Sequence, residues 1–106
     1  MQSKAQFADE KIKKAFDKLK KKDQELYKII SQTLKNIEDN VFCGIQIPKK
    51  LIPKYYSKRF NVKNLWKYNL PNAWRLIYSV EGENFTIISI ILEWMDHKTY
   101  EKRFKY

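Results

Sequence analysis

Apolar residues recur at helical spacing in the first forty residues of the chain. One stripe consists of Ala8, Ile12, Ala15, Phe16 and Leu19, and the other of Leu26, Ile29, Ile30, Thr33, Leu34 and Ile37. They predict two amphipathic helices, the first over residues 8–21 and the second between Asp23, a candidate N-cap, and Asn40, which can close it. Because the link between them is very short, the two helices should run antiparallel.

Strand-forming residues replace the helical pattern from residue 64 to residue 80. Trp, Tyr, Leu, Ile and Val crowd two runs joined across Pro71-Asn72, which predicts a hairpin. The length of its loop stays open, and the parity of that length decides whether Lys67 or Tyr68 shares a face with Arg75.

A third strand is predicted where residues 85–94 are apolar at nearly every position. Such a run is typical of an inner strand buried on both sides. A turn signal at residues 81–84 precedes it, and Ala5-Gln6-Phe7 can end an edge strand near the N-terminus.

The remaining segments are irregular or short. Gly44, Pro48 and Pro53 interrupt residues 41–64, which predicts a connector with one helical turn near 54–60. Asp96 is a candidate N-cap for a short last helix through Phe104. The expected fold is therefore α+β, with two N-terminal helices packed on an antiparallel sheet of three to four strands and a short C-terminal helix. The two helices can cover one face of the sheet, which leaves the opposite face free for a ligand.

Length and composition limit the class of protein. The chain has 106 residues, of which 43% are apolar and 15% aromatic, so it can form one domain, residues 1–106, around a single core. No apolar run approaches the roughly 18 residues of a membrane span, and the N-terminus is too charged for a secretory signal, so a cytoplasmic protein is expected. Cys43 is the single cysteine, which excludes an internal disulfide and predicts a buried thiol.

The net charge of +10 is concentrated in the middle of the chain. Residues 41–80 carry eight Lys and Arg and no Asp or Glu. Such a segment attracts phosphate through counterion release, so nucleic acid is the expected partner. In the alternative, these cations only solubilise the domain or pair with an acidic protein. Tyr55, Tyr56 and Phe60 lie among the cations and have two open roles, stacking on exposed bases or pinning the connector to the core.

Cleavage of RNA without a metal requires a base, an acid and cations that hold the pentacoordinate phosphate. Arg75 suits the last role because its planar guanidinium grips two phosphate oxygens and keeps its proton. His97 is the single histidine, and on a helix it would share a face with Tyr100, which makes a proton-transfer pair possible. A surface or capping role is the alternative for His97. A metal site and a cofactor are not expected, since no second histidine or cysteine is present.

Several motifs resemble the RelE/ParE toxin superfamily, specifically its RelE-like branch. The resemblance rests on Asn-Leu-Trp-Lys-Tyr-Asn-Leu from residue 64, on Trp-Arg-Leu-Ile-Tyr from residue 74, on Ile-Ser-Ile from residue 88 and on Tyr100. Gly-Ile-Gln-Ile-Pro-Lys from residue 44 and the closing Asp-His-Lys-x-Tyr-Glu-x-x-Phe are similar to archaeal members in particular.

The resemblance implies a curved sheet, an N-terminal strand and a type II toxin that cleaves mRNA on the ribosome without a metal and is neutralised by a cognate antitoxin. It implies that Arg75 contacts the scissile phosphate, that Lys67 lies on the catalytic face, that Tyr100 stacks on or orients the substrate and that His97 transfers protons. The cations expected to bind RNA are Lys49, Lys50, Lys54, Lys58, Arg59 and Arg103.

Two positions depart from the pattern of the family. Asn69 stands where a second lysine is expected, and Glu93-Trp94 stand where a basic residue ends the last strand. Two alternatives therefore stay open, a site rebuilt around His97 or a site that is weak or absent. The rival functions are a ParE-like inhibitor of DNA gyrase, which a supercoiling assay would distinguish, and a non-catalytic module that binds RNA or protein on the same fold.

Overall fold

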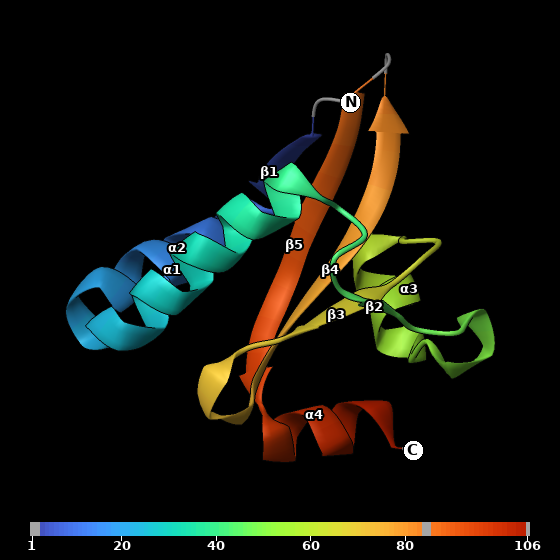
Figure 1. Ribbon diagram of the computed structural model, residues 1–106. Helices are drawn as coiled ribbons and strands as arrows, with labels where there is room; N and C mark the ends of the chain where they lie inside the picture. The colour runs from blue at the N-terminus through green and yellow to red at the C-terminus, as the bar shows by residue number, and fades with distance from the viewer. Residues whose placement is uncertain (1–2, 84–85, 106) are drawn as a thin grey trace.

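The two N-terminal helices begin at aspartate caps, of which the sequence predicted Asp23, whereas Asp9 was expected inside the first helix. In a computed structural model of the protein, which describes residues 3–83 and 86–105, α1 spans Glu10–Lys22 and α2 spans Gln24–Asp39. Asp9 accepts a hydrogen bond from the Ile12 amide at 2.9 Å, and Asp23 accepts one from the Leu26 amide at 3.1 Å. Asp23 ends the first helix and starts the second, so the two lie side by side in Figure 1.

The other elements are short or belong to the sheet. The strands are β1 (Ser3–Phe7), β2 (Ile45–Gln46), β3 (Trp66–Asn69), β4 (Trp74–Glu83) and β5 (Thr86–Asp96). The helices are α3 (Lys54–Phe60), α4 (His97–Phe104) and the single turns η1 (Lys49–Leu51) and η2 (Pro71–Ala73). The predicted helical turn near 54–60 and the predicted Asp96 cap are both confirmed, since Asp96 accepts from the Thr99 amide at 2.8 Å.

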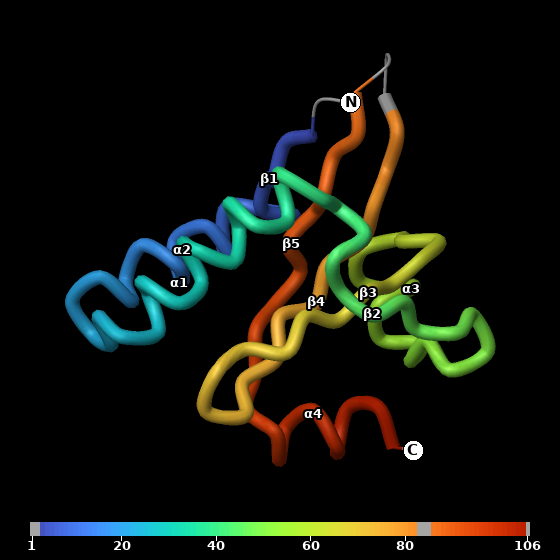
Figure 2. The backbone as a smooth tube through the Cα atoms, in the orientation of Figure 1, coloured from blue at the N-terminus to red at the C-terminus, as the bar shows by residue number. Residues whose placement is uncertain are grey.

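The sheet has five described strands in the order β1-β5-β4-β3-β2, rather than three to four, and it is mixed rather than antiparallel. β1 lies at one edge and runs parallel to β5, which it can do because both N-terminal helices separate it from the rest of the sheet. β2 was not predicted, since two residues carry no readable periodicity. Figure 2 traces the long β5 beside β1 and β4.

The register of the β3–β4 hairpin shows which residue shares a face of the sheet with Arg75. Asn69 pairs with Arg75 and Lys67 pairs with Ile77, so Lys67 shares the face of Arg75 and Tyr68 lies on the other face. The loop between them is tight because Asn72 and Ala73 both adopt left-handed backbone conformations, each with φ of 62°. The Leu70 amide then donates to the Trp74 carbonyl at 2.8 Å, which closes the loop.

Hydrophobic clusters cover both faces of the sheet. Beneath α1 and α2 lies the first cluster, which contains Phe16, Leu26, Ile30, Ile37, Leu70, Leu76, Tyr78 and Ile91. The second cluster contains Ile47, Tyr56, Val62, Leu65, Ile77, Leu92, Met95, Tyr100 and Phe104. The expectation of a free opposite face is therefore wrong, because side chains of α3, α4 and the connector pack against it. Figure 1 shows α3 and α4 away from α1 and α2.

A β-bulge changes which residues at the end of β5 face each cluster. Ile77 pairs with Glu93 whereas Tyr78 pairs with Ile91, so Leu92 is an extra residue in the ladder. Ile91 consequently joins the first cluster, and Leu92 and Met95 join the second. The bulge also turns the Glu93 side chain toward the second face, where α3 and α4 lie.

Residues 81–83 of the predicted turn belong to β4, which continues through Glu83. Asn84 and Phe85, which belonged to the predicted turn and third strand, lie outside the described residues. Within the described ranges, no helix combines the length and the apolar character that crossing a membrane requires.

Candidate nucleic-acid interface

Two cations of the hairpin converge on one aromatic ring of the last helix. The Lys67 ammonium lies 5.1 Å from the centre of the Tyr100 ring, and the Arg75 guanidinium carbon lies 5.8 Å from it. Tyr100 is 4% exposed and stacks on Phe104 at 4.4 Å between ring centres, so the ring is held by the second cluster. Three of the four predicted catalytic residues are therefore brought together.

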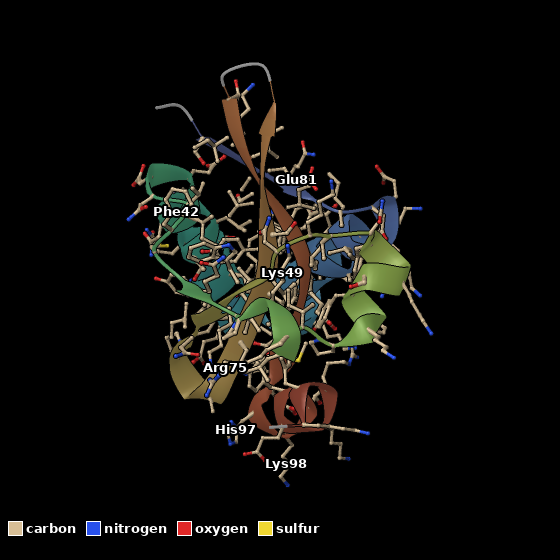
Figure 3. All side chains as sticks on the ribbon, turned by 90° about the vertical axis from the view of Figure 1, so that its right-hand side faces the viewer. Phe42, Lys49, Arg75, Glu81, His97 and Lys98 are labelled. Atoms are coloured by element: carbon tan, nitrogen blue, oxygen red, sulfur yellow. The ribbon has the colours of Figure 1, made fainter. Side chains whose placement is uncertain are left out.

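Arg75 is half-buried at the end of the sheet that α4 closes. One guanidinium nitrogen donates to the Trp74 carbonyl at 3.1 Å. The ion pairs found among residues 3–83 and 86–105 do not include Arg75, so no described carboxylate neutralises it. In Figure 3 Arg75, His97 and Lys98 all lie toward this end, far from Glu81. The end is thus positively charged, and the charge is presented beside an aromatic surface.

His97 begins α4, but it is bonded to Glu101 and exposed rather than packed beside Tyr100. Its Nε2 lies 2.8 Å from Glu101 Oε1, and the side chain is 50% exposed. Tyr100 instead turns into the second cluster. With the proton on Nε2, the imidazole donates to the carboxylate and leaves Nδ1 available to take or give a proton. The predicted His97–Tyr100 pair is replaced by a His97–Glu101 pair.

Arg103 connects parts of the protein to one another, whereas the sequence predicted that it binds RNA. Its guanidinium donates to Glu93 Oε2 at 2.9 Å and lies 3.9 Å from the centre of the Tyr55 ring. The two charged side chains are 26% and 18% exposed. Arg103 therefore ties α4 to β5 and α3. The signal for this was present in the sequence as Glu93, the acid that stands where the family pattern has a base.

Arg59 is also engaged in contacts within the protein. It donates to the Tyr55 hydroxyl at 2.6 Å, pairs with Asp9 at 3.7 Å and lies 4.6 Å from the centre of the Phe60 ring. The Tyr55 hydroxyl bond is the main cause that raises the pKa of Arg59 above its ordinary value, against the opposing effect of burial. Arg59 thus links α3 to the cap of α1 while 35% of its side chain stays exposed.

The four predicted lysines fall into two pairs. Lys54 and Lys58 lie exposed on α3, and Lys49 and Lys50 lie exposed on η1. The aromatic residues between them pin the connector, which decides between the two roles left open by the sequence. Tyr56 is fully buried and lies 5.6 Å from Phe104 between ring centres. Burial raises the pKa of its hydroxyl above the ordinary value, and the nearby Glu93 carboxylate adds to that effect.

Tyr78 fixes the start of the connector, and nothing in the sequence pattern singled it out. Its buried hydroxyl donates to the Val41 carbonyl at 2.8 Å and accepts from the Gly44 amide at 3.1 Å. A Cβ on Gly44 would lie 2.6 Å from that hydroxyl and 2.7 Å from the Lys67 carbonyl, so only glycine fits. Cys43 is exposed in the loop held this way, and the prediction of a buried thiol is wrong.

Asp96, His97 and Glu93 each have a different partner, namely Thr99, Glu101 and Arg103. The described residues hold no group of three or more His, Cys, Asp or Glu side chains placed to bind a metal ion.

In comparisons with known proteins, no protein-family model, curated protein or solved structure matches the chain.

Proposed function

We propose that the protein is a metal-independent endoribonuclease of the RelE-like toxin type, which cleaves mRNA in the ribosome. The observation that carries the proposal is the convergence of Lys67 and Arg75 on the Tyr100 ring. Two cations held over one buried aromatic ring suit a phosphate, because both positive charges attract it and the ring fixes their positions.

Each residue of this group has a role in the proposed reaction. Arg75 stabilises the charge that develops on the pentacoordinate phosphate, and Lys67 adds a second positive charge on the same face. Tyr100, buried in the second cluster, supports both cations from beneath. His97, held through Nε2 by Glu101, exchanges a proton with the 2′-hydroxyl or the leaving 5′-oxygen. The exposed Lys54 and Lys58 contact the sugar-phosphate backbone of mRNA or ribosomal RNA.

The decisive experiment is induction of variants in cells, with cleavage sites on ribosome-bound message mapped by primer extension. Arg75→Ala should reduce cleavage about a hundredfold or more, since a cation at a phosphoryl transition state contributes on that scale. Arg75→Lys keeps the charge but loses the planar fork, so it should recover only part of the activity. Lys14→Ala, an exposed position on α1, removes one charge far from the hairpin and should cleave like the wild type. Equal toxicity of Arg75→Ala and wild type would refute the catalytic role.

The salt dependence of RNA binding separates the exposed cations from those engaged within the protein. Lys54→Ala should flatten the log-log slope of affinity against salt by about 0.7 to 0.9, the contribution of one phosphate contact. Arg103→Lys, which keeps the charge near Glu93, should leave that slope unchanged. A slope that stays the same in Lys54→Ala would show that α3 faces another partner.

A second candidate, a non-catalytic RNA-binding module, is favoured by Asn69 and by the Arg103–Glu93 ion pair. Asn69 places a neutral side chain opposite Arg75 in the hairpin, and the ion pair removes Arg103 from any phosphate. This module would bind RNA with the same dependence on Arg75 but would leave message intact and growth unaffected.

A further inference from the structure

Three large apolar side chains are exposed around β2. Phe42 is 56% exposed, Ile45 52% and Leu51 43%, and in the described part of the chain no other large apolar side chain is reported as exposed. All three belong to residues 42–51, a short segment that contains β2. Large apolar groups exposed within one short segment indicate an interaction surface rather than ordinary solvent-facing surface.

β2 is the last strand in the order of the sheet, so one of its edges has no strand beside it among the described residues. The unpaired backbone N–H and C=O groups of such an edge can accept a strand from another chain. Ile45 pairs with Lys67 and therefore lies on the face of Arg75, whereas Gln46 pairs with Trp66 on the opposite face. Phe42 packs on that opposite side, 5.4 Å from Trp66 between ring centres. Apolar groups thus flank the edge on both faces, which suits an added strand that is apolar on both sides.

Hydrogen bonds hold residues 42–51 in place, so the fold itself keeps their apolar side chains exposed. Tyr78 binds the backbone of Val41 and Gly44 on one side of β2. On the other side Ile47 is 3% exposed, and its amide donates to the Leu65 carbonyl at 2.8 Å. A surface fixed before binding loses little conformational entropy when a partner docks. In Figure 3, the labels of Phe42 and Lys49 mark two positions along this segment.

Charge identifies the kind of partner. Lys49 and Lys50 follow the strand directly, and a hollow of about 220 Å³ beside them is lined in part by Lys49 and Lys63. A second copy of this chain would bring the same lysines together and carries a net charge of +10 itself, so self-association is opposed. RNA would satisfy the lysines but would leave the aliphatic Ile45 and Leu51 side chains facing polar groups.

We propose that the β2 edge binds an extended segment of another protein, apolar in its middle and acidic at one end, which adds a sixth strand to the sheet. The central apolar side chains cover Phe42, Ile45 and Leu51, and the acidic end pairs with Lys49 and Lys50, which are adjacent in η1. The proposal goes beyond the proposed function and does not depend on RNA cleavage, because none of these residues takes part in the chemistry assigned to Arg75.

The test is an NMR titration of the isotope-labelled full chain with a synthetic capped peptide, a run of valines with two glutamates at one end. Amide signals of residues 42–51 should move. Two control peptides, one with lysines in place of the glutamates and one with glycines in place of the valines, should leave those signals unchanged. These controls need no protein variant, so they test the surface even if a substitution were to unfold the chain.

A pair of matched variants tests the charge contribution. K49E/K50E should weaken binding of the acidic peptide by about tenfold. The reason is that two exposed ion pairs at the edge of the interface become two repulsive contacts. K21E/K22E makes the same change in net charge at exposed positions of α1 and should bind like the wild type. Equal loss in both variants would mean that only overall charge matters and would refute the proposal.

Three other outcomes would also refute it. In the first, the signals of residues 42–51 stay in place at millimolar peptide. In the second, single-stranded RNA moves the same signals more strongly than the acidic peptide, which would make the surface an RNA site. In the third, the signals shift with protein concentration alone, which would make the surface a contact between copies of this chain.

Discussion

The two faces of the sheet are covered in different ways. The first face is covered by α1 and α2, of 13 and 16 residues, whose apolar stripes point inward and whose charges point to solvent. The second face is covered by α3 and α4, of seven and eight residues, and by the connector. Here cations lie directly on the aromatic rings of the core, as Arg75 does on Tyr100, Arg103 on Tyr55 and Arg59 on Phe60.

This difference separates structure from candidate function. On the first face, apolar and charged residues are sorted to opposite sides of each helix, so the charges contribute little to the core. On the second face, the same aromatic residues fill the core and support the charges, since a ring can bury its body and attract a cation to its face. The cationic surface of the second face therefore rests on the aromatic rings of its core, so a change in the rings should also move the cations.

The largest expected effect tests whether the two clusters unfold as one unit. Ile30→Ala in the first cluster and Leu92→Ala in the second each remove a fully buried side chain and should each cost about 2–5 kcal/mol. Because β4 and β5 form a wall of both clusters, each variant should still unfold in a single transition by denaturant titration. Two separate transitions in Leu92→Ala would mean that the second face is an independent, weaker layer.

The sequence predicted the first face better than the second for a physical reason. α1 and α2 are long enough for a period of 3.6 residues to repeat several times, and Asp23 and Asn40 mark the ends of the second helix. α3 and α4 complete about two turns each, too few for a stripe to stand out from chance. Tyr56 therefore read equally well as a base-stacking residue or a core residue, and its burial became known only from the packing of Phe104 against it.

The candidate site shows the same limit. Arg75 could be singled out as a charge within an apolar strand, but its proximity to Lys67 depends on the loop after Asn69, where Asn72 and Ala73 take left-handed conformations. A non-glycine residue with positive φ is rare enough that sequence patterns do not predict two in succession. Glu93 signalled that a cation could be paired, but the sequence did not show that this cation is Arg103, since the β-bulge at Leu92 is what turns Glu93 toward it.

The next effect tests whether the second face depends on its internal ion pair. Glu93→Ala leaves the Arg103 guanidinium, 26% exposed, without its partner and should cost about 2–3 kcal/mol, somewhat below the loss for a fully buried pair. Glu101→Ala, the matched control, removes a carboxylate that is 65% exposed and should cost at most about 1 kcal/mol. Thermal unfolding of both variants measures the difference. Equal stabilities would show that Arg103 is held by Tyr55 alone.

A smaller effect tests the anchor between the first face and the connector. Gly44→Ala places a Cβ 2.6 Å from the Tyr78 hydroxyl and 2.7 Å from the Lys67 carbonyl, so the loop must shift, at about 1–3 kcal/mol. Gly82→Ala is the control, because a Cβ there meets no atom within 4 Å, and it should be neutral or slightly stabilising. Because the clash involves the backbone of Lys67, Gly44→Ala should also weaken RNA binding, and unchanged binding would separate the anchor from the candidate site.

The smallest effect concerns pH and the start of α4. Asp96 is fully exposed, and the Thr99 amide and hydroxyl that bond its carboxylate lower its pKa below the ordinary value of 3.8. The ionised form therefore stabilises the helix start, a contribution that is fully present above that ordinary value and is lost as the pH falls through the lowered one. The Thr99 amide signal in NMR should titrate with a midpoint below 3.8, and in Asp96→Asn, which keeps an acceptor oxygen, this titration should vanish. A midpoint above 3.8 would contradict the cap. Since Tyr100 and Phe104 extend from this helix into the second cluster, loss of the cap in acid should loosen the ring beneath Lys67 and Arg75.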